Sequence, residues 1–134
     1  MTLYLDASAL VAAQVATPAR AVVLDALDAD PVWCTSAVTL TEALALVDRL
    51  LDEPLLRSDL EDQIRLLWDR LWVVPVDQRC LDRAAELARE QPVRLADALH
   101  LAAADRLPRP VQFVTFDPAH IPVALSLGFD VVSS

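Results

Sequence analysis

The sequence predicts a three-layer α/β/α fold, in which a mostly parallel sheet of about five strands lies between two layers of helices. Short apolar runs alternate with longer amphipathic or Ala-rich segments along the whole chain, as in folds whose parallel strands are joined by helices. The 134 residues are 55% hydrophobic and 23% charged, a balance that suits an ordinary core and excludes a disordered chain. We therefore expect residues 1–134 to form a single domain.

Five short apolar runs are expected to be the strands of this sheet. Prolines and polar residues separate them from the segments that follow. Helices on both faces of a parallel sheet bury both sides of each strand, so such strands are continuously apolar. The expected strands are residues 2–6, 32–35, 73–76, 111–116 and 129–133.

Helical segments occupy the intervals, and particular residues mark their ends. Pro18 suits a first helical turn, Asp77 can cap the helix after it, and Gly128, the single glycine, ends the last one. After Pro54, apolar residues including Ile64 recur at helical spacing, with charge on the opposite face. The expected helices are residues 7–15, 18–29, 36–51, 55–72, 78–90, 94–107 and 118–128.

Composition argues against a membrane protein and favours a cytoplasmic one. No stretch reaches the roughly 20 uncharged apolar residues that a bilayer span requires. The apolar N-terminus lacks the basic start of a signal peptide, because the first arginine is Arg20, and Asp6 would fall within any export core. In such a chain we expect Cys34 and Cys80 to be reduced and buried.

The charge balance limits how this protein could bind nucleic acid. The formal net charge is −9, and all eleven basic residues are arginines. This balance argues against binding by broad electrostatic attraction. It is compatible with an acidic site that metal ions fill, assisted by local arginines.

Four acidic residues lie in otherwise apolar surroundings. Asp6 and Asp117 stand at the carboxyl ends of expected strands, where ligands bind in parallel α/β folds. Glu42 and Asp97 stand on expected helices. Structural roles are open for each, since the first two can cap helices and Glu42 can face solvent. Asp97 can pair with Arg94, three residues earlier on the same helical face.

Taken together, the four acids indicate a metal site. Converging carboxylates repel one another unless a cation neutralises them, and Mg²⁺ and Mn²⁺ prefer oxygen ligands. One or two such ions can lower the pKa of a water and stabilise the charge that develops on a phosphodiester. Arg94 and the hydroxyls of Ser8 and Thr115 are placed in the sequence to assist.

The four acids occur in the stretches YLDASAL (4–10), TLTEAL (39–44), RLADALHLA (94–102) and FVTFD (113–117). In order and spacing these stretches resemble the four acidic motifs of the PIN domain family, in particular those of VapC-type toxins, the ribonuclease halves of bacterial toxin–antitoxin pairs. The resemblance covers essentially the whole chain. It implies a metal-dependent endoribonuclease that acts on RNA, is restrained by an antitoxin and commonly forms a homodimer.

The resemblance also assigns roles to residues. Ser8 and Thr115 match the hydroxyl positions that accompany the first and last acids, and Arg94 matches a frequent basic residue before the third acid. The implied cofactor is Mg²⁺ or Mn²⁺. The implied metal and catalytic set is Asp6, Glu42, Asp97 and Asp117.

Other classes of acid-bearing α/β domain fit less well. Response-regulator receivers need a lysine and haloacid-dehalogenase-type phosphatases normally use one, but this chain has none. The phosphatases also need a DxD motif after the first strand, where this chain has Asp6-Ala7-Ser8. A Gly-rich phosphate loop is absent as well. The main alternative is a PIN-like domain that binds RNA or protein without cutting it.

Two histidines and two tryptophans give weaker indications. His100 lies on nearly the same helical face as Asp97, and we expect it to hydrogen-bond within the structure. His120 has no partner pattern, and no paired Cys/His set indicates zinc. Trp68 and Trp72 are expected one helical turn apart, either in the core or in a groove for a partner helix.

Overall fold

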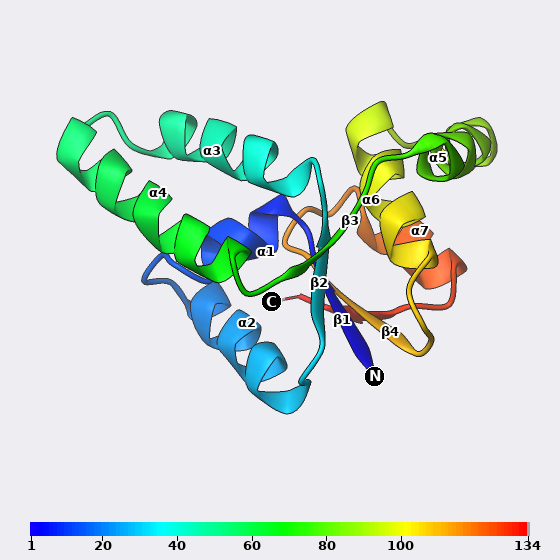
Figure 1. Cartoon of the computed structure of the whole chain (residues 1–134), viewed down its shortest axis with the longest axis horizontal. Coiled ribbons are helices and arrows are strands. Elements are labelled where there is room, and N and C mark those ends of the chain that lie inside the picture. The colour runs from blue at the N-terminus through cyan, green and yellow to red at the C-terminus, as the bar shows by residue number, and fades with distance from the viewer. Residues whose placement is uncertain (134) are drawn as a thin grey trace.

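A computed structural model describes residues 1–133, in which five strands form one sheet (Figure 1). The strands are β1 (Thr2–Leu5), β2 (Trp33–Ser36), β3 (Trp72–Val74), β4 (Val111–Val114) and β5 (Asp130–Val132). Their order across the sheet is β3-β2-β1-β4-β5, and every neighbouring pair runs parallel. The predicted fold class is confirmed, and the sheet of the described residues is parallel throughout.

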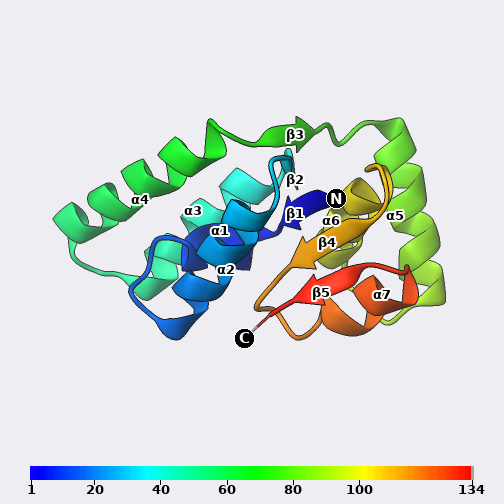
Figure 2. The same cartoon turned by 90° about the horizontal axis from the view of Figure 1, so that it is seen from below.

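Helices cover both faces of this sheet. They are α1 (Ala7–Ala12), α2 (Pro18–Ala29), α3 (Thr39–Leu50), α4 (Pro54–Trp68), α5 (Gln78–Glu90), α6 (Leu95–Asp105) and α7 (Ile121–Ser126). Figure 2 shows α1 to α4 on one side of the sheet and α5 to α7 on the other. This arrangement gives the three layers that the alternation of segments predicted.

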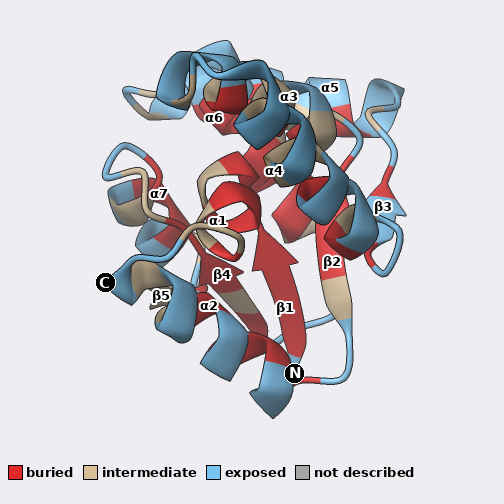
Figure 3. Cartoon of the chain, turned by 90° about the vertical axis from the view of Figure 1, so that its left-hand side faces the viewer, coloured by how far each residue is buried: buried red, intermediate tan, exposed pale blue. Residues whose placement is uncertain are grey.

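The two helical layers pack on alternate side chains of the central strand. Leu3 and Leu5 of β1 join the apolar cluster formed with α1 to α4. Tyr4 points to the other side, where it stacks on Phe113 of β4 with ring centroids 5.1 Å apart. All four side chains are fully buried, and Figure 3 shows the central strands as the buried part of the molecule. Burial on both faces explains why these strands are mostly apolar, with Gln112 of β4 an exception that is only partly buried.

The order of the strands reverses at the centre of the sheet. From β1 the chain moves outward through β2 to β3, and it then returns to place β4 against the other side of β1. The carboxyl ends of β1 and β4 are therefore adjacent, and the backbone N–H of Asp6 bonds to the carbonyl of Val114 at 3.4 Å. Ligands bind at such a reversal in parallel α/β folds, and Asp6 and Asp117 follow these two strands.

The predicted boundaries are wrong in one place that matters. The helix expected over residues 55–72 ends at Trp68, because the chain turns at residues 69–71 and Trp72 begins β3. Trp68 is half-buried against the core, whereas Trp72 lies on the edge strand and is 72% exposed. The two tryptophans share no helical face, so the partner groove inferred from their spacing has no support.

The burial predicted for the two cysteines is confirmed. Cys34 and Cys80 are both buried and both free thiols. Burial raises the pKa of Cys34 to about 11, so this thiol stays protonated and unreactive at neutral pH. Among the residues that the structure describes, no helix has the length and apolar character needed to cross a bilayer.

Candidate functional site

Asp6 lies where β1 ends and α1 begins, and four donors surround its carboxylate. Oδ1 accepts hydrogen bonds from the backbone N–H of Ala9 at 2.9 Å and from Oγ of Ser8 at 2.6 Å. Oδ2 accepts from the hydroxyl of Thr115 and faces Nδ1 of His120 at 2.7 Å. The side chain is 1% exposed, so these donors take the place of water. Asp6 also caps α1, which was one of the two roles considered for it.

His120 lies between two buried carboxylates. Its Nδ1 faces Asp6, and its Nε2 lies 2.6 Å from Oδ1 of Asp97 and 3.7 Å from Oδ2 of Asp117. Burial alone would lower the pKa of His120, but hydrogen bonds and charges of Asp6 and Asp97 outweigh burial and raise this pKa to about 9. Without a bound metal, the imidazole is therefore a cation at neutral pH.

The same contacts change the titration of Asp6. Burial raises the pKa of a carboxyl group, but the hydrogen bond and charge of His120 lower it more. Hydrogen bonds from Ser8 and Thr115 lower it further. Asp6 is thus held as a carboxylate although it is almost fully enclosed.

Asp97 enters the same cluster from the first turn of α6. Its Oδ1 meets His120, and its Oδ2 lies 3.4 Å from Nε of Arg94. The Arg94 side chain is 80% exposed, so its pairing with Asp97 is weak. Asp97 does pair with Arg94, which was the structural role considered for it. Its shorter contact, however, is with His120.

Asp117 and Thr115 come from the end of β4. Thr115 donates its hydroxyl hydrogen to Asp6 and accepts a hydrogen bond from the backbone N–H of Asp117 at 3.0 Å. Oδ1 of Asp117 accepts from the backbone N–H of Ala119 at 3.0 Å, which closes the turn before α7. Asp117 does not cap α7 itself, whose N-cap is His120. Its Oδ2 points toward Nε2 of His120.

Glu42 approaches from α3 and is held by the second histidine. Nε2 of His100 lies 2.8 Å from Oε1 of Glu42, and Nδ1 of His100 lies 2.7 Å from the Tyr4 hydroxyl. Burial raises the pKa of Tyr4, so this hydroxyl keeps its proton. Tyr4 is the donor to Nδ1, and the imidazole donates Nε2–H to Glu42. The internal hydrogen bonding expected of His100 is confirmed.

All four predicted acids line one cleft of about 560 Å³. Ser8, Arg94 and His120 line it too, together with Arg49 from the last turn of α3. Thr115 lies behind its wall, in contact with Asp6. Single donor atoms of Asp97, Asp117 and His120 lie within 4.8 Å of one another, so among residues 1–133 this group could hold a metal ion. Carboxylate and imidazole donors suit a divalent ion.

The sequence did not indicate His120, which faces three of the four acids in the cleft. Its partners Asp6 and Asp97 are 114 and 23 residues away, so no local pattern contains the cluster. One signal was available, because His120 follows Asp117 by three residues, a spacing that places two side chains near each other in a turn of helix. Arg49 was missed as well, since a single arginine at a helix end is common on protein surfaces.

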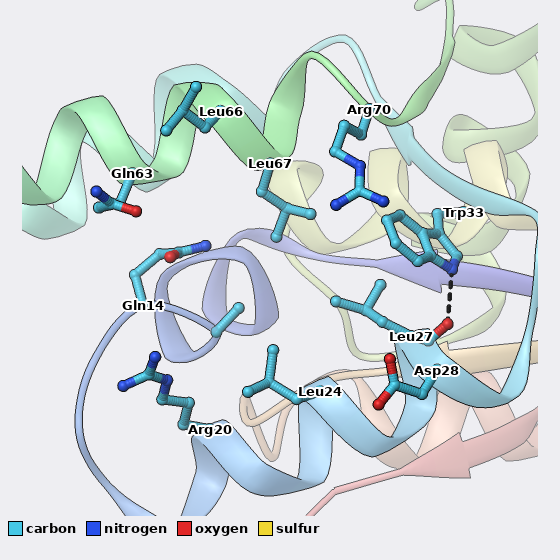
Figure 4. Close-up of a pocket in the computed structure, with 11 residues that line it drawn as sticks. Gln14, Arg20, Leu24, Leu27, Asp28, Trp33, Gln63, Leu66, Leu67 and Arg70 are labelled. Atoms are coloured by element: carbon cyan, nitrogen blue, oxygen red, sulfur yellow. Dashed lines mark hydrogen bonds between the residues drawn. The ribbon is translucent and has the colours of Figure 1, made fainter.

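A second cavity, of about 280 Å³, lies between α1, α2 and α4 and is shown in Figure 4. Its walls include Leu24, Leu27 and Leu67, and Trp33 donates its indole N–H to the carbonyl of Leu27 at 3.0 Å. The Arg70 guanidinium stacks over the Trp33 ring, 4.7 Å from the ring centre. None of the four acids lines this cavity.

A parallel α/β/α fold with carboxylates at its central strand reversal defines the class of this protein as an α/β/α domain with an acidic cleft. A family model of the PIN domain matches residues 3–126, and the chain belongs to the PIN domain family. The resemblance drawn from the four sequence stretches is therefore confirmed at the level of the family. No curated protein matches the chain in sequence.

Several solved structures share this fold. FitAcB from Neisseria gonorrhoeae has a TM-score of 0.74 at 17% identity, covering 98% of this chain and 96% of that chain. VapBC2 from Rickettsia felis, bound to a DNA fragment from its promoter, has a TM-score of 0.70 at 15% identity, covering 100% and 99%. VapBC-5 from Mycobacterium tuberculosis, a member of the VapBC family of toxin–antitoxin systems, has a TM-score of 0.67 at 19% identity, covering all of both chains. At these identities the likeness concerns the fold.

Proposed function

We propose that residues 1–134 act as a single PIN domain that is a metal-dependent endoribonuclease and the toxin of a toxin–antitoxin pair. The observation that carries this proposal is that all four acids line one cleft, at the reversal of a parallel sheet. Membership of the PIN family supports nuclease chemistry. Similarity in fold to toxin–antitoxin structures supports the toxin role and the antitoxin partner.

The proposed cofactor is Mg²⁺ or Mn²⁺. The donor set fits such an ion, because carboxylates from separate elements line one cleft and Mg²⁺ and Mn²⁺ prefer oxygen ligands. When bound, the ion activates water and stabilises the charge that develops on a phosphodiester. The proposed metal and catalytic set is Asp6, Glu42, Asp97 and Asp117.

The remaining residues of the cleft support this set. Ser8 and Thr115 hold the two oxygens of Asp6 in place, and His100 holds Glu42. Arg94 and Arg49 line the cleft with positive charge that can bind an RNA phosphate. The net charge of −9 makes such local contacts more important than long-range attraction. We further propose a cytoplasmic location and a homodimer.

The first test is cleavage of a mixed cellular RNA pool by the purified chain, with Mg²⁺, with Mn²⁺ and with chelator. Defined cuts are expected only with metal. Asp97→Asn should lower the cleavage rate by at least about 100-fold, the scale expected when one charge-stabilising group is lost from an active site. Asp62→Asn, an exposed carboxylate on α4, is the matched control and should cut normally.

The same two variants test the toxin role in a bacterial host. Expression of the wild type and of Asp62→Asn should arrest growth, and expression of Asp97→Asn should not. Full RNA cleavage by Asp97→Asn would refute the assigned site. A folded wild type that binds divalent metal but cuts no RNA would favour the alternative, a PIN-like module that binds without cutting.

A further inference from the structure

The contacts of His120 differ from those of a histidine that only fills a core. Each ring nitrogen meets a buried carboxylate, with Nδ1 2.7 Å from Asp6 and Nε2 2.6 Å from Asp97. Nε2 also faces Asp117 at 3.7 Å. The His120 side chain is 5% exposed, yet it lines the acidic cleft. The ring therefore separates Asp6, on one side, from Asp97 and Asp117, on the other.

Asp6 has few lone pairs left for a metal ion. Two donors already occupy Oδ1, the Ser8 hydroxyl and the Ala9 backbone N–H. Oδ2 accepts from the Thr115 hydroxyl and from His120. Both oxygens of this carboxylate are thus engaged by donors of the protein, one of them the imidazole. Histidines that bind metals commonly donate their other ring N–H to such a carboxylate, which fixes the tautomer and the ring orientation.

On these contacts we propose that Nε2 of His120 binds the divalent ion directly, beside Asp97 and Asp117, and that Asp6 orients the imidazole instead of binding the ion. This inference rests on the proposed metal-dependent function and changes the role of one of its four acids. The three donor atoms lie within 4.8 Å of one another. The two separations from Nε2, 2.6 and 3.7 Å, bracket the roughly 3 Å between neighbouring ligands of a small ion.

A nitrogen donor in the cluster determines which ion is preferred. Mg²⁺ is a hard ion that takes oxygen ligands almost exclusively, whereas imidazole suits ions later in the first transition row. Mn²⁺ accepts both kinds of donor. The chain is therefore expected to bind Mn²⁺ more tightly than Mg²⁺, and this preference should depend on His120.

The test is pulsed electron paramagnetic resonance of the full chain loaded with Mn²⁺. A directly bound imidazole gives a nitrogen hyperfine coupling, which changes in a predictable way when the protein is labelled with ¹⁵N-histidine. The chain has two histidines, so His100→Gln assigns the signal. The coupling is expected in the wild type and in His100→Gln, and it is expected to be absent in His120→Ala.

Calorimetric titration gives the affinities in parallel. His120→Ala should weaken Mn²⁺ binding by at least about tenfold and Mg²⁺ binding by less, whereas Asp62→Asn should change neither. Asp6→Asn should keep the nitrogen coupling, because the amide oxygen can still accept from Nδ1. If His120→Ala fails to fold, the labelled wild type alone decides whether an imidazole binds the ion.

The possible failures are distinct. Mn²⁺ that binds in an Asp97-dependent way without nitrogen coupling would overturn this inference and leave the proposed nuclease intact. A coupling that disappears in His100→Gln would show that His100, and not His120, binds the ion, and it would overturn the inference as well. Loss of all Mn²⁺ binding in Asp6→Asn would make Asp6 a direct ligand and refute its orienting role. A folded wild type that binds no divalent ion would overturn both the inference and the proposed metal dependence.

Discussion

His120 and His100 are both buried beside the acidic cleft and both contact carboxylates, but their surroundings differ. His120 lies between Asp6 and Asp97, two carboxylates that are almost fully enclosed. His100 meets one partly exposed carboxylate, Glu42, and one neutral hydroxyl, that of Tyr4. The two buried carboxylates beside His120 raise its pKa through their hydrogen bonds and charges, although burial of the ring alone would lower it.

The largest expected difference between the two is in stability. His120→Ala leaves Asp6 and Asp97 buried without their shared cation, and in chelator it should lower the free energy of unfolding by about 3–5 kcal/mol. His100→Ala should cost about 1–3 kcal/mol, because it leaves the buried Tyr4 hydroxyl unpaired, whereas the partly exposed Glu42 can bond to water instead. Urea denaturation with the slope compared between variants measures both.

A double variant sharpens this result. In an Asp6→Asn background, His120→Ala should cost less than in the wild type, since one of the two buried charges is gone. An equal cost in both backgrounds would show that packing of the ring, and not its charge, stabilises the fold.

The next expected effect is on the pH dependence of stability without metal. The pKa of His120 is raised from 6.5 to about 9 by Asp6 and Asp97, with Asp117 also facing the ring. The protonated His120 therefore adds to the free energy of unfolding. This contribution is fully present below pH 6.5 and is lost as the pH rises through about 9. The loss is on the order of 3 kcal/mol, since one pKa unit corresponds to about 1.4 kcal/mol.

Urea denaturation in chelator at a series of pH values between 6 and 10 measures this loss. The His120→Ala variant should show a much flatter profile over this range, and His100→Gln should keep the decline. A wild-type stability that stays constant up to pH 10 would contradict the cationic state assigned to His120.

The smallest expected effect is at Tyr4. Tyr4→Phe removes the hydroxyl that bonds to Nδ1 of His100 but keeps the ring that stacks on Phe113. The free energy of unfolding should fall by about 1 kcal/mol, the net worth of one buried hydrogen bond. The decline of stability above pH 6.5 should be unchanged, because no charge beside His120 is altered. A flattened profile would show that the two histidines are coupled.

The fold and the four acids could be predicted because their signals are local. Each strand is a short apolar run, and Asp6 and Asp117 directly follow two of these runs, so the sequence itself places them at strand ends. The adjacency of β1 and β4 has no such signal, since it depends on where the chain re-enters the sheet after β3. Asp6 and Asp117 were expected at one site because both follow strands of a parallel sheet, and the family resemblance supported that expectation.

Two other features could not be predicted for related reasons. The role of His120 depends on residues that are distant in the sequence, and a single histidine after Pro118 and Ala119 carries no periodic signal. The end of α4 at Trp68 was missed because Leu71 continues the apolar spacing of the helix. In the structure Leu71 packs against the core from a turn, and Trp72 pairs with Cys34 in the sheet.

The contacts of Asp6 also determine when during synthesis the cleft can form. Two of its donors, Thr115 and His120, lie 109 and 114 residues further along the chain, and β1 is completed on one side only by β4. At about 5–20 residues per second, a ribosome needs on the order of 10 s to make the intervening segment. Throughout that time Asp6 lacks His120 and Thr115, and Glu42 lacks His100 until α6 has been made. A nascent chain therefore exposes no assembled cleft to the messenger or the ribosome that is making it.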